Sequence, residues 1–238
     1  MALITTQDFQ IPLFHKVYDG NIPDVAFFSE VTQDLLKRHH RLCGHRHAAT
    51  LVFDKVNLSE ETMEKLLYGN IHFIAGAKSS PFKESFERPL KDLEESLLPG
   101  TKNYAFTLEL FGKECKCALV YSESFFTKQL ASLTANTVKC QDKLKILQNS
   151  LLAPLKREKG KVLTMKELSE KFAFILSAQQ MKEIFDVELT IESGFSMIKY
   201  KLNREMLNHL MKHRLGSTLL ITNQTSLHPE EVIKGYRD

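Results

Sequence analysis

The sequence lacks any apolar run long enough to cross a membrane, and its first residues lack a basic segment followed by such a run. It is also poor in cysteine, and none of the cysteines is spaced as a CxxC pair. The four are Cys43, Cys115, Cys117 and Cys140. Without a membrane span, a leader or a disulfide framework, we expect a soluble, cytoplasmic protein with reduced thiols and no membrane partner.

An excess of charge of one sign is lacking too. The chain has 32 lysines and arginines against 29 aspartates and glutamates, a formal net charge of +3. This balance permits a nucleic-acid partner without arguing for one. The 238 residues are 43% hydrophobic and 26% charged, which is enough for one large domain or two modest ones. Local patterns must therefore carry the functional argument.

One stretch near the N-terminus contains the strongest candidate for a functional residue. Residues 50–53 form an uncharged, β-branched and aromatic run that predicts a buried strand, and Asp54 ends it. Asn57 and Ser59 then favour the start of a helix, with Glu60 three residues after Asn57. Ligands of open α/β sheets bind at the carboxyl ends of strands, so Asp54 could meet a metal or a phosphate there. The residues alone leave open that Asp54 only caps the helix or closes a turn.

Apolar spacing predicts strands and helices in alternation along the chain. The expected strands are a hairpin at 2–6 and 11–18, single strands at 71–75 and 217–222, and pairs within 104–121 and 185–202. The expected helices lie within 24–43, 59–68, 90–97, 126–151, 165–185, 203–211 and 229–238. The order strand, helix, strand over residues 50–75 predicts a right-handed parallel crossover.

The clearest periodic signal is a seam of apolar residues stepping by fours and threes from Phe126 to Leu151. It predicts a long helix ended by Pro154, packed against another helix. A dimerising coiled coil and a packed helix within one domain both need such a seam. We favour packing within the domain because Thr137 and Cys140 weaken the middle of the seam, so a homodimer is the alternative.

Basic residues gather near residues 37–47, at the end of the helix predicted from residue 24. The positive charges of Arg38 and Arg41 would interact favourably with the dipole at the C-terminus of that helix, and both side chains could also contact phosphate. Cys43 and the neighbouring histidines could suggest zinc. However, no second pair of cysteine or histidine ligands follows, which disfavours a metal site here.

Three passages together resemble a known family. They are Ile11-Pro-Leu-Phe-His-Lys-Val-Tyr-Asp-Gly-Asn-Ile-Pro-Asp24, Leu51-Val-Phe-Asp-Lys-Val-Asn57, and Leu220-Ile-Thr-Asn with Pro229-Glu-Glu-Val-Ile-Lys-Gly-Tyr-Arg237. In order and separation they are similar to insertion-sequence transposases of the DDE (Asp-Asp-Glu) class, in the branch whose RNase H-like core is interrupted by a strand-rich insertion. The resemblance spans nearly the whole chain.

The resemblance implies an α/β fold with an RNase H-like core whose first strand is absent. The core would occupy residues 1–78 and 217–238, and an α+β insertion domain would occupy 79–216. Asp54 falls on the family's second catalytic, metal-binding aspartate. Tyr236 falls on the tyrosine that opens the family's tyrosine, arginine, glutamate, lysine motif and would lie near the DNA backbone, while Arg237 matches a frequent Tyr-Arg pair.

The implied activity is cleavage and strand transfer of DNA with Mg²⁺ or Mn²⁺, because two divalent ions held by three carboxylates serve an in-line displacement at phosphorus. The chain departs from the pattern: the first aspartate and the glutamate would lie outside it, and Val56 replaces a frequent glycine. We therefore expect an inactive fragment of a transposase. The alternative is a non-catalytic DNA-binding or dimerising module, and a complete but unusual nuclease is a third interpretation.

Overall fold

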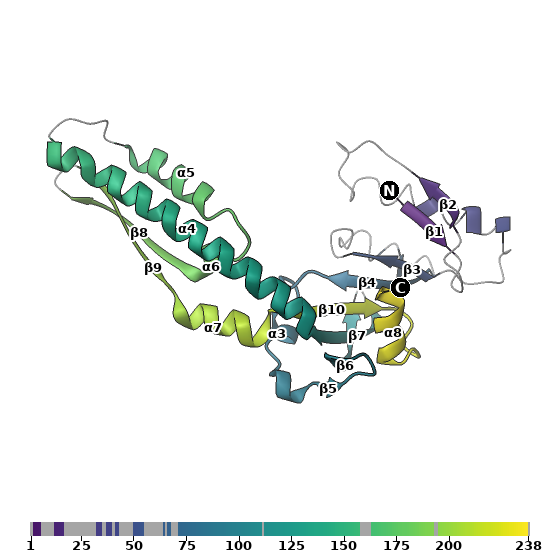
Figure 1. Ribbon diagram of the computed structural model, residues 1–238. Coiled ribbons are helices and arrows are strands. Elements are labelled where there is room, and N and C mark those ends of the chain that lie inside the picture. The colour runs from purple at the N-terminus through teal and green to yellow at the C-terminus, as the bar shows by residue number, and fades with distance from the viewer. Residues whose placement is uncertain are drawn as a thin grey trace. The chain divides into compact units, whose positions relative to one another are not determined.

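The computed structural model describes most of the chain from residue 71 onward and shorter pieces before it (Figure 1). The described residues are 2–5, 12–16, 32–34, 37–39, 41–42, 50–54, 64, 66–67, 71–110, 112–157, 163–192 and 195–237. The chain divides into a first unit, Met1–Tyr121 with Ser217–Asp238, and a second unit, Ser122–Gly216. No helix among the described residues is long and apolar enough to cross a membrane.

A six-stranded sheet forms the centre of the first unit, in the order β3-β4-β10-β7-β6-β5. Its strands are β3 (Thr50–Phe53), β4 (His72–Ala77), β5 (Glu94–Glu95), β6 (Thr101–Leu110), β7 (Lys113–Ser122) and β10 (Ser217–Thr222). β3 and β4 are parallel, whereas β10 is antiparallel to both β4 and β7. The sheet is therefore mixed, and the predicted α/β class is confirmed.

The predicted strand, helix, strand crossover is confirmed as a parallel pair, in which Phe53 stands opposite Ala75. Residues 64, 66 and 67 between the strands are helical, and Leu66 and Leu67 are buried in the core. The prediction that β3 is a buried strand is wrong in part, because Val52 is 48% exposed. β3 lies at one end of the sheet, so only part of its short run is covered.

The two faces of the sheet have separate apolar clusters. One contains Phe53, Phe73 and Leu219 with side chains from the helical residues 66 and 67. The other contains Ile74 and Leu220 with Val232 and Ile233 of α8 (Pro229–Arg237). α8 lies so close to the sheet that a Cβ added to Gly235 would stand 2.9 Å from Ile74 Cδ1. The predicted last helix is thus confirmed and covers one face of the sheet.

The predicted N-terminal hairpin is confirmed as β1 (Ala2–Thr5) paired antiparallel with β2 (Pro12–Lys16). It forms a two-stranded sheet of its own, separate from the six-stranded sheet. The resemblance would place such a hairpin in the same core sheet as Asp54. The hydrogen bonding of the described strands therefore does not reproduce that part of the expected core.

The predicted boundary at residue 78 differs from the division of the structure. Residues 79–121 belong to the first unit because β6 and β7 hydrogen-bond into the sheet beside β10. The second unit ends at Gly216, the residue predicted for the end of the insertion. The helix predicted at 90–97 is only the 3-10 turn Leu90–Asp92, followed by β5, and a short helix α3 precedes it at Lys83–Phe86.

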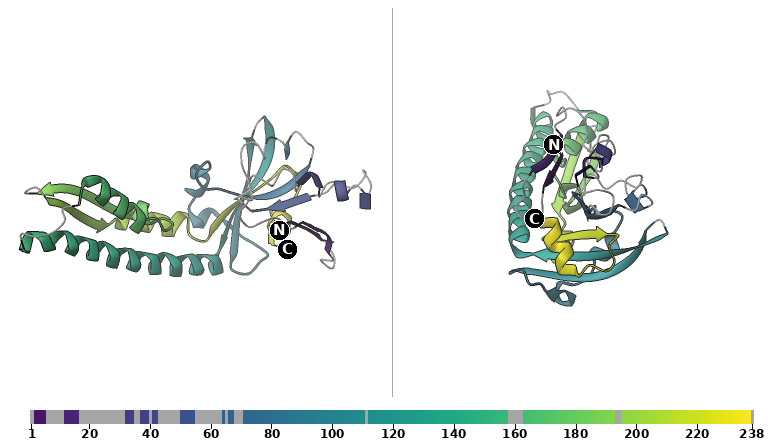
Figure 2. Two further views of the ribbon diagram at one scale, coloured as in Figure 1. Left: turned by 90° about the horizontal axis from the view of Figure 1, so that it is seen from above. Right: turned by 90° about the vertical axis from the view of Figure 1, so that its right-hand side faces the viewer.

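The second unit packs helices on a two-stranded antiparallel sheet (Figure 2). Its elements are α4 (Glu123–Arg157), α5 (Met165–Ile175), α6 (Met181–Ile184), β8 (Phe185–Glu192), β9 (Phe195–Leu202) and α7 (Arg204–His213). The seam of α4 is buried within this unit, with Leu144 fully covered, which confirms the intramolecular packing we favoured. The prediction that Pro154 ends this helix is wrong, since α4 continues to Arg157.

Candidate functional site

A hydrogen bond joins Asp54 and Tyr236, which the resemblance places at the metal ions and near the DNA backbone. Tyr236 Oη donates to Asp54 Oδ1 at 3.2 Å, although the residues are 182 positions apart in the sequence. Asp54 follows the last residue of β3 and is exposed, whereas Tyr236 lies near the end of α8 and is half-buried. The structure thus brings the end of the edge strand and the end of the last helix together.

The start of α8 is fixed by carboxylates in its first turn. Glu230 Oε2 accepts a hydrogen bond from Ser96 Oγ at 2.8 Å, and its Oε1 accepts one from Asn103 Nδ2 at 3.1 Å. Glu231 Oε2 accepts one from the backbone N–H of His228 at 2.6 Å. Acidic groups are favourable at a helix N-terminus, so these contacts both start the helix and tie it to β6. They determine where Tyr236 lies, one helix length further on.

The amino ends of β3 and β4 are held by the residues that follow β10. Asn223 Oδ1 accepts from the backbone N–H of Phe73 at 3.1 Å, and Asn223 Nδ2 donates to the carbonyl of Ile71 at 2.7 Å. Thr50 Oγ1 donates to Gln224 Oε1 at 3.3 Å. The asparagine side chain therefore replaces a strand partner for β4. Sequence reasoning missed Asn223 and Glu230, because an Asn after a strand or a Glu in a first turn has local explanations as well.

Burial and the neighbouring carboxylate change the acidity of Tyr236. Burial is the main cause that raises its pKa to about 12, and the charge of Asp54 and the hydrogen bond to Asp54 raise it further in the same direction. Tyr236 is therefore a neutral phenol at physiological pH. Its hydroxyl acts as a donor to one oxygen of Asp54.

The arginines predicted to contact DNA fall in different parts of the first unit. Arg237 is exposed at the end of α8, where its Nη2 donates to Thr101 Oγ1 at 3.3 Å. Because a guanidinium has five N–H donors, this contact orients Arg237 while leaving donors for a phosphate. Arg38 and Arg41 are exposed and lie in helical residues near the N-terminus. Their expected role rests on charge and exposure, and it remains a prediction.

The carboxylate of Asp54 fits one ligand position of a hard divalent cation, since it is an oxygen ligand on an exposed residue. A site needs more ligands than one. Within the part of the chain that the structure describes, no group of three His, Cys, Asp or Glu side chains that could hold an ion includes Asp54. The expected Mg²⁺ or Mn²⁺ site is thus not completed by described residues. Cys43 of the basic cluster and its histidines at positions 40, 45 and 47 lie outside the described residues.

Comparisons of the chain with protein families, with curated proteins and with solved structures each find no match. The functional argument therefore depends on the geometry of the Asp54–Tyr236 pair and on the resemblance of the three passages that contain or flank it.

Proposed function

We propose that this chain is part of a DDE transposase, in which Asp54 is one of the metal-binding carboxylates and Tyr236 lies beside the bound DNA backbone. The hydrogen bond between Tyr236 Oη and Asp54 Oδ1 carries the proposal. The resemblance places Asp54 at the metal ions and Tyr236 near the DNA backbone, from two separate passages, and local sequence gives no reason for the two residues to meet. Their proximity supports this placement, because the metal ions act on the DNA backbone.

Each described residue of the pair has a simple role in the proposed site. When bound, the divalent ions supply a Lewis acid and an activated oxygen nucleophile at phosphorus. Tyr236 donates a hydrogen bond to Oδ1 of Asp54, which orients the carboxylate at the end of β3. Arg237 places a permanent positive charge at the same end of α8, where a phosphate of the DNA would be attracted.

Asp54 is the one metal-binding carboxylate that the resemblance assigns to this chain. Because one carboxylate does not hold a pair of divalent ions, we propose that the chain on its own binds DNA without cutting it. The test incubates the purified chain with a transposon-end duplex in Mg²⁺ or Mn²⁺. We expect no nicking above the level given by the Asp54→Ala variant. Nicking by the natural sequence that Asp54→Ala abolishes would show a complete nuclease and contradict the proposed incomplete site.

Binding to DNA is measured separately as the dependence of affinity on salt. Each phosphate contact contributes about one unit to the slope of log affinity against log salt, so Arg38→Ala, Arg41→Ala and Arg237→Ala should each reduce the slope by about 1. Arg204→Ala is the matched control, because Arg204 is exposed but lies in the second unit. The absence of DNA binding, or equal slopes for all four variants, would contradict the proposal.

A further inference from the structure

Two histidines lie one turn apart on α7 of the second unit (Figure 1). His209 and His213 are four residues apart, so both side chains lie on the same side of the helix. The centroids of their rings are 4.9 Å apart, and the planes of the rings are inclined to each other by 30°. The two imidazoles therefore contact each other. We refer to them as the α7 histidine pair.

The apolar core of the unit uses other residues of α7. Leu210 is fully buried, and Leu207 and Met211 pack against the same core. His209 and His213 are only partly buried. The apolar residues account for the packing of α7, so they do not explain why two histidines stand one turn apart beside them.

One nitrogen of the pair is buried without a hydrogen-bond partner among the described residues. It is Nδ1 of His213. Buried polar atoms of folded proteins are nearly always satisfied, and an exception calls for a specific explanation such as a bound water or ion. An ion bound to this nitrogen would satisfy it.

We propose that the α7 histidine pair binds a Zn²⁺ ion. Two histidines at this spacing on one helix face are the zinc ligands of the HExxH motif, because their nitrogens reach one ion. Tetrahedral zinc with Zn–N bonds of about 2.0–2.1 Å places two such nitrogens about 3.3 Å apart. The ligand nitrogens of the pair lie within 4.8 Å of each other, so a rotation of the rings brings them to that separation. Leu210 stands where the motif has its glutamate, so the pair lacks that general base and is a binding site.

The charges of the helix favour a cation at this position. His213 lies in the last turn of α7, where the dipole of the helix attracts positive charge. Glu205 precedes the pair by one turn and adds a carboxylate to the same side of the helix. Of the cations next to His213 in sequence, Arg214 is paired with Glu183 at 2.9 Å, and Lys212 is exposed to solvent, which screens its charge.

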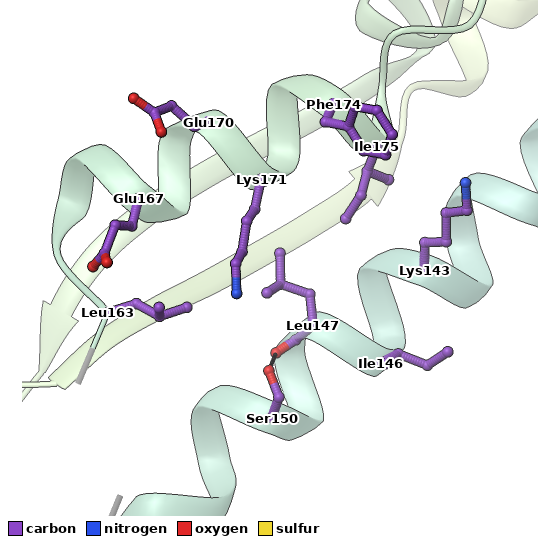
Figure 3. A pocket seen from close by; sticks show the side chains of 10 residues that line it. All are labelled: Lys143, Ile146, Leu147, Ser150, Leu163, Glu167, Glu170, Lys171, Phe174 and Ile175. Carbon is purple, nitrogen blue, oxygen red and sulfur yellow. Dashed lines mark hydrogen bonds between the residues drawn. The ribbon is translucent and has the colours of Figure 1, made fainter. Parts of the chain in front are cut away.

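The type of ligand selects the ion. Imidazole nitrogens suit Zn²⁺, whereas Mg²⁺ prefers oxygen ligands, so this ion differs from the one proposed at Asp54. The groove between α4 and α5 offers a comparison within the same unit (Figure 3). It is lined by the carboxylates of Glu167 and Glu170, with Lys143 and Lys171, and its lining residues include no histidine or cysteine. The groove should therefore contribute nothing to zinc binding.

The first test is calorimetric titration of the full chain, purified without a histidine tag, with Zn²⁺. We expect the dissociation constant to rise about tenfold or more in His209→Asn and in His213→Asn, since loss of even an outer partner of a zinc ligand has an effect of that size. Both residues are partly exposed, so the variants should fold. Glu170→Gln is one matched control. His72→Asn is the other, because Nδ1 of His72 is also buried without a described partner, but His72 lies on β4. Both controls should leave the affinity unchanged.

A second set of measurements locates the ion. The NMR signals of the His209 and His213 ring nitrogens should shift together on addition of Zn²⁺, and an excess of Mg²⁺ should leave them in place. His213→Cys should retain the binding that His213→Ala removes, because a thiolate is also a zinc ligand, and a purely structural role would not be restored in this way. A chain that binds no Zn²⁺, binding unchanged in His209→Asn and His213→Asn, or binding lost instead in Asp54→Ala or Cys43→Ser would each overturn the proposal.

Discussion

The Asp54–Tyr236 pair can be tested through the acidity of the tyrosine. Asp54→Asn removes the negative charge beside the phenol, so the pKa of Tyr236 should fall from about 12 toward the ordinary 10.0. It should remain above the ordinary value because burial is the largest cause of the shift and stays in place. A carbon-detected NMR titration of the tyrosine rings measures this, with the Tyr236 signal assigned from Tyr236→Phe. A titration unchanged by Asp54→Asn would mean that the pair does not form in solution.

Truncation of two nearby residues of α4 should change the free energy of unfolding by very different amounts. Leu144 is fully buried, so Leu144→Ala should lower the free energy of unfolding of the second unit by about 3 kcal/mol, through lost transfer energy and a cavity. Ile146 is 69% exposed, so Ile146→Ala should change it by no more than about 0.5 kcal/mol. Urea unfolding followed by circular dichroism gives both values. Comparable losses at the two positions would mean that the seam does not face the core.

The turn that begins α6 holds the one non-glycine residue with positive φ among the residues the structure describes, Gln180 at φ 68°. Met181 and Ile184 of this short helix are buried, which fixes the turn in place. Gln180→Gly should stabilise the unit by about 0.5–1 kcal/mol, since glycine has no Cβ to strain a left-handed backbone. Ser177→Gly, in the preceding turn, should destabilise it instead. Thermal unfolding of the two variants compares them, and stabilisation by both or by neither would contradict the assignment.

Elements set by local periodicity could be predicted from sequence. The hairpin β8–β9, the long helix α4 and the Asn203-capped α7 follow from alternation, from steps of three and four, and from an N-cap residue. Elements set by distant pairing could not. Residues 104–121 predict two strands, but nothing local shows that the second pairs with β10, almost a hundred residues later. The boundary predicted at residue 78 therefore differs from the division of the structure at Tyr121.

The candidate site also has parts that the sequence predicts and parts that it does not. A β-branched run predicts the strand that ends at Asp54, and the resemblance adds Tyr236, but their hydrogen bond is visible only in the fold. The contacts that support the pair also join distant parts of the chain. Glu230 reaches Asn103 over 127 positions, and Asn223 reaches Phe73 over 150. Such contacts depend on how the sheet is assembled, which one sequence does not reveal.

At the scale of the whole molecule, the second unit should fold without the first. Its two ends are joined by a hydrogen bond of 2.9 Å from the N–H of Ser122 to the carbonyl of Gly216, and it has its own apolar core. The excised segment Ser122–Gly216 should therefore unfold cooperatively on heating and give dispersed amide NMR signals. Leu168→Asp is the control, since Leu168 is fully buried and the charge should abolish folding. Gradual, non-cooperative melting of the natural segment would show that it depends on the first unit.

The first unit should lose stability in alkali because it buries two thiols on one strand. Burial raises the pKa of Cys115 from 9.0 to about 11 and that of Cys117 from 9.0 to about 12. Since each folded pKa lies above the unfolded value, the stabilising contribution is complete below pH 9.0 and is lost as the pH rises from there toward about 12. Tyr236 acts in the same direction from its ordinary pKa of 10.0 upward.

Urea unfolding between pH 7 and pH 11 measures this loss, against the double variant Cys115→Ala, Cys117→Ala. The variant should be less stable than the natural sequence at pH 7, because two fully buried side chains lose their sulfur atoms. Its stability should nevertheless fall less steeply above pH 9, since neither position can then release a proton on unfolding. If the free energies of unfolding of the two proteins fall in parallel with pH, the prediction is contradicted, and the two thiols are in contact with solvent. Converging curves are expected if β7 lies inside the sheet, between β10 and β6.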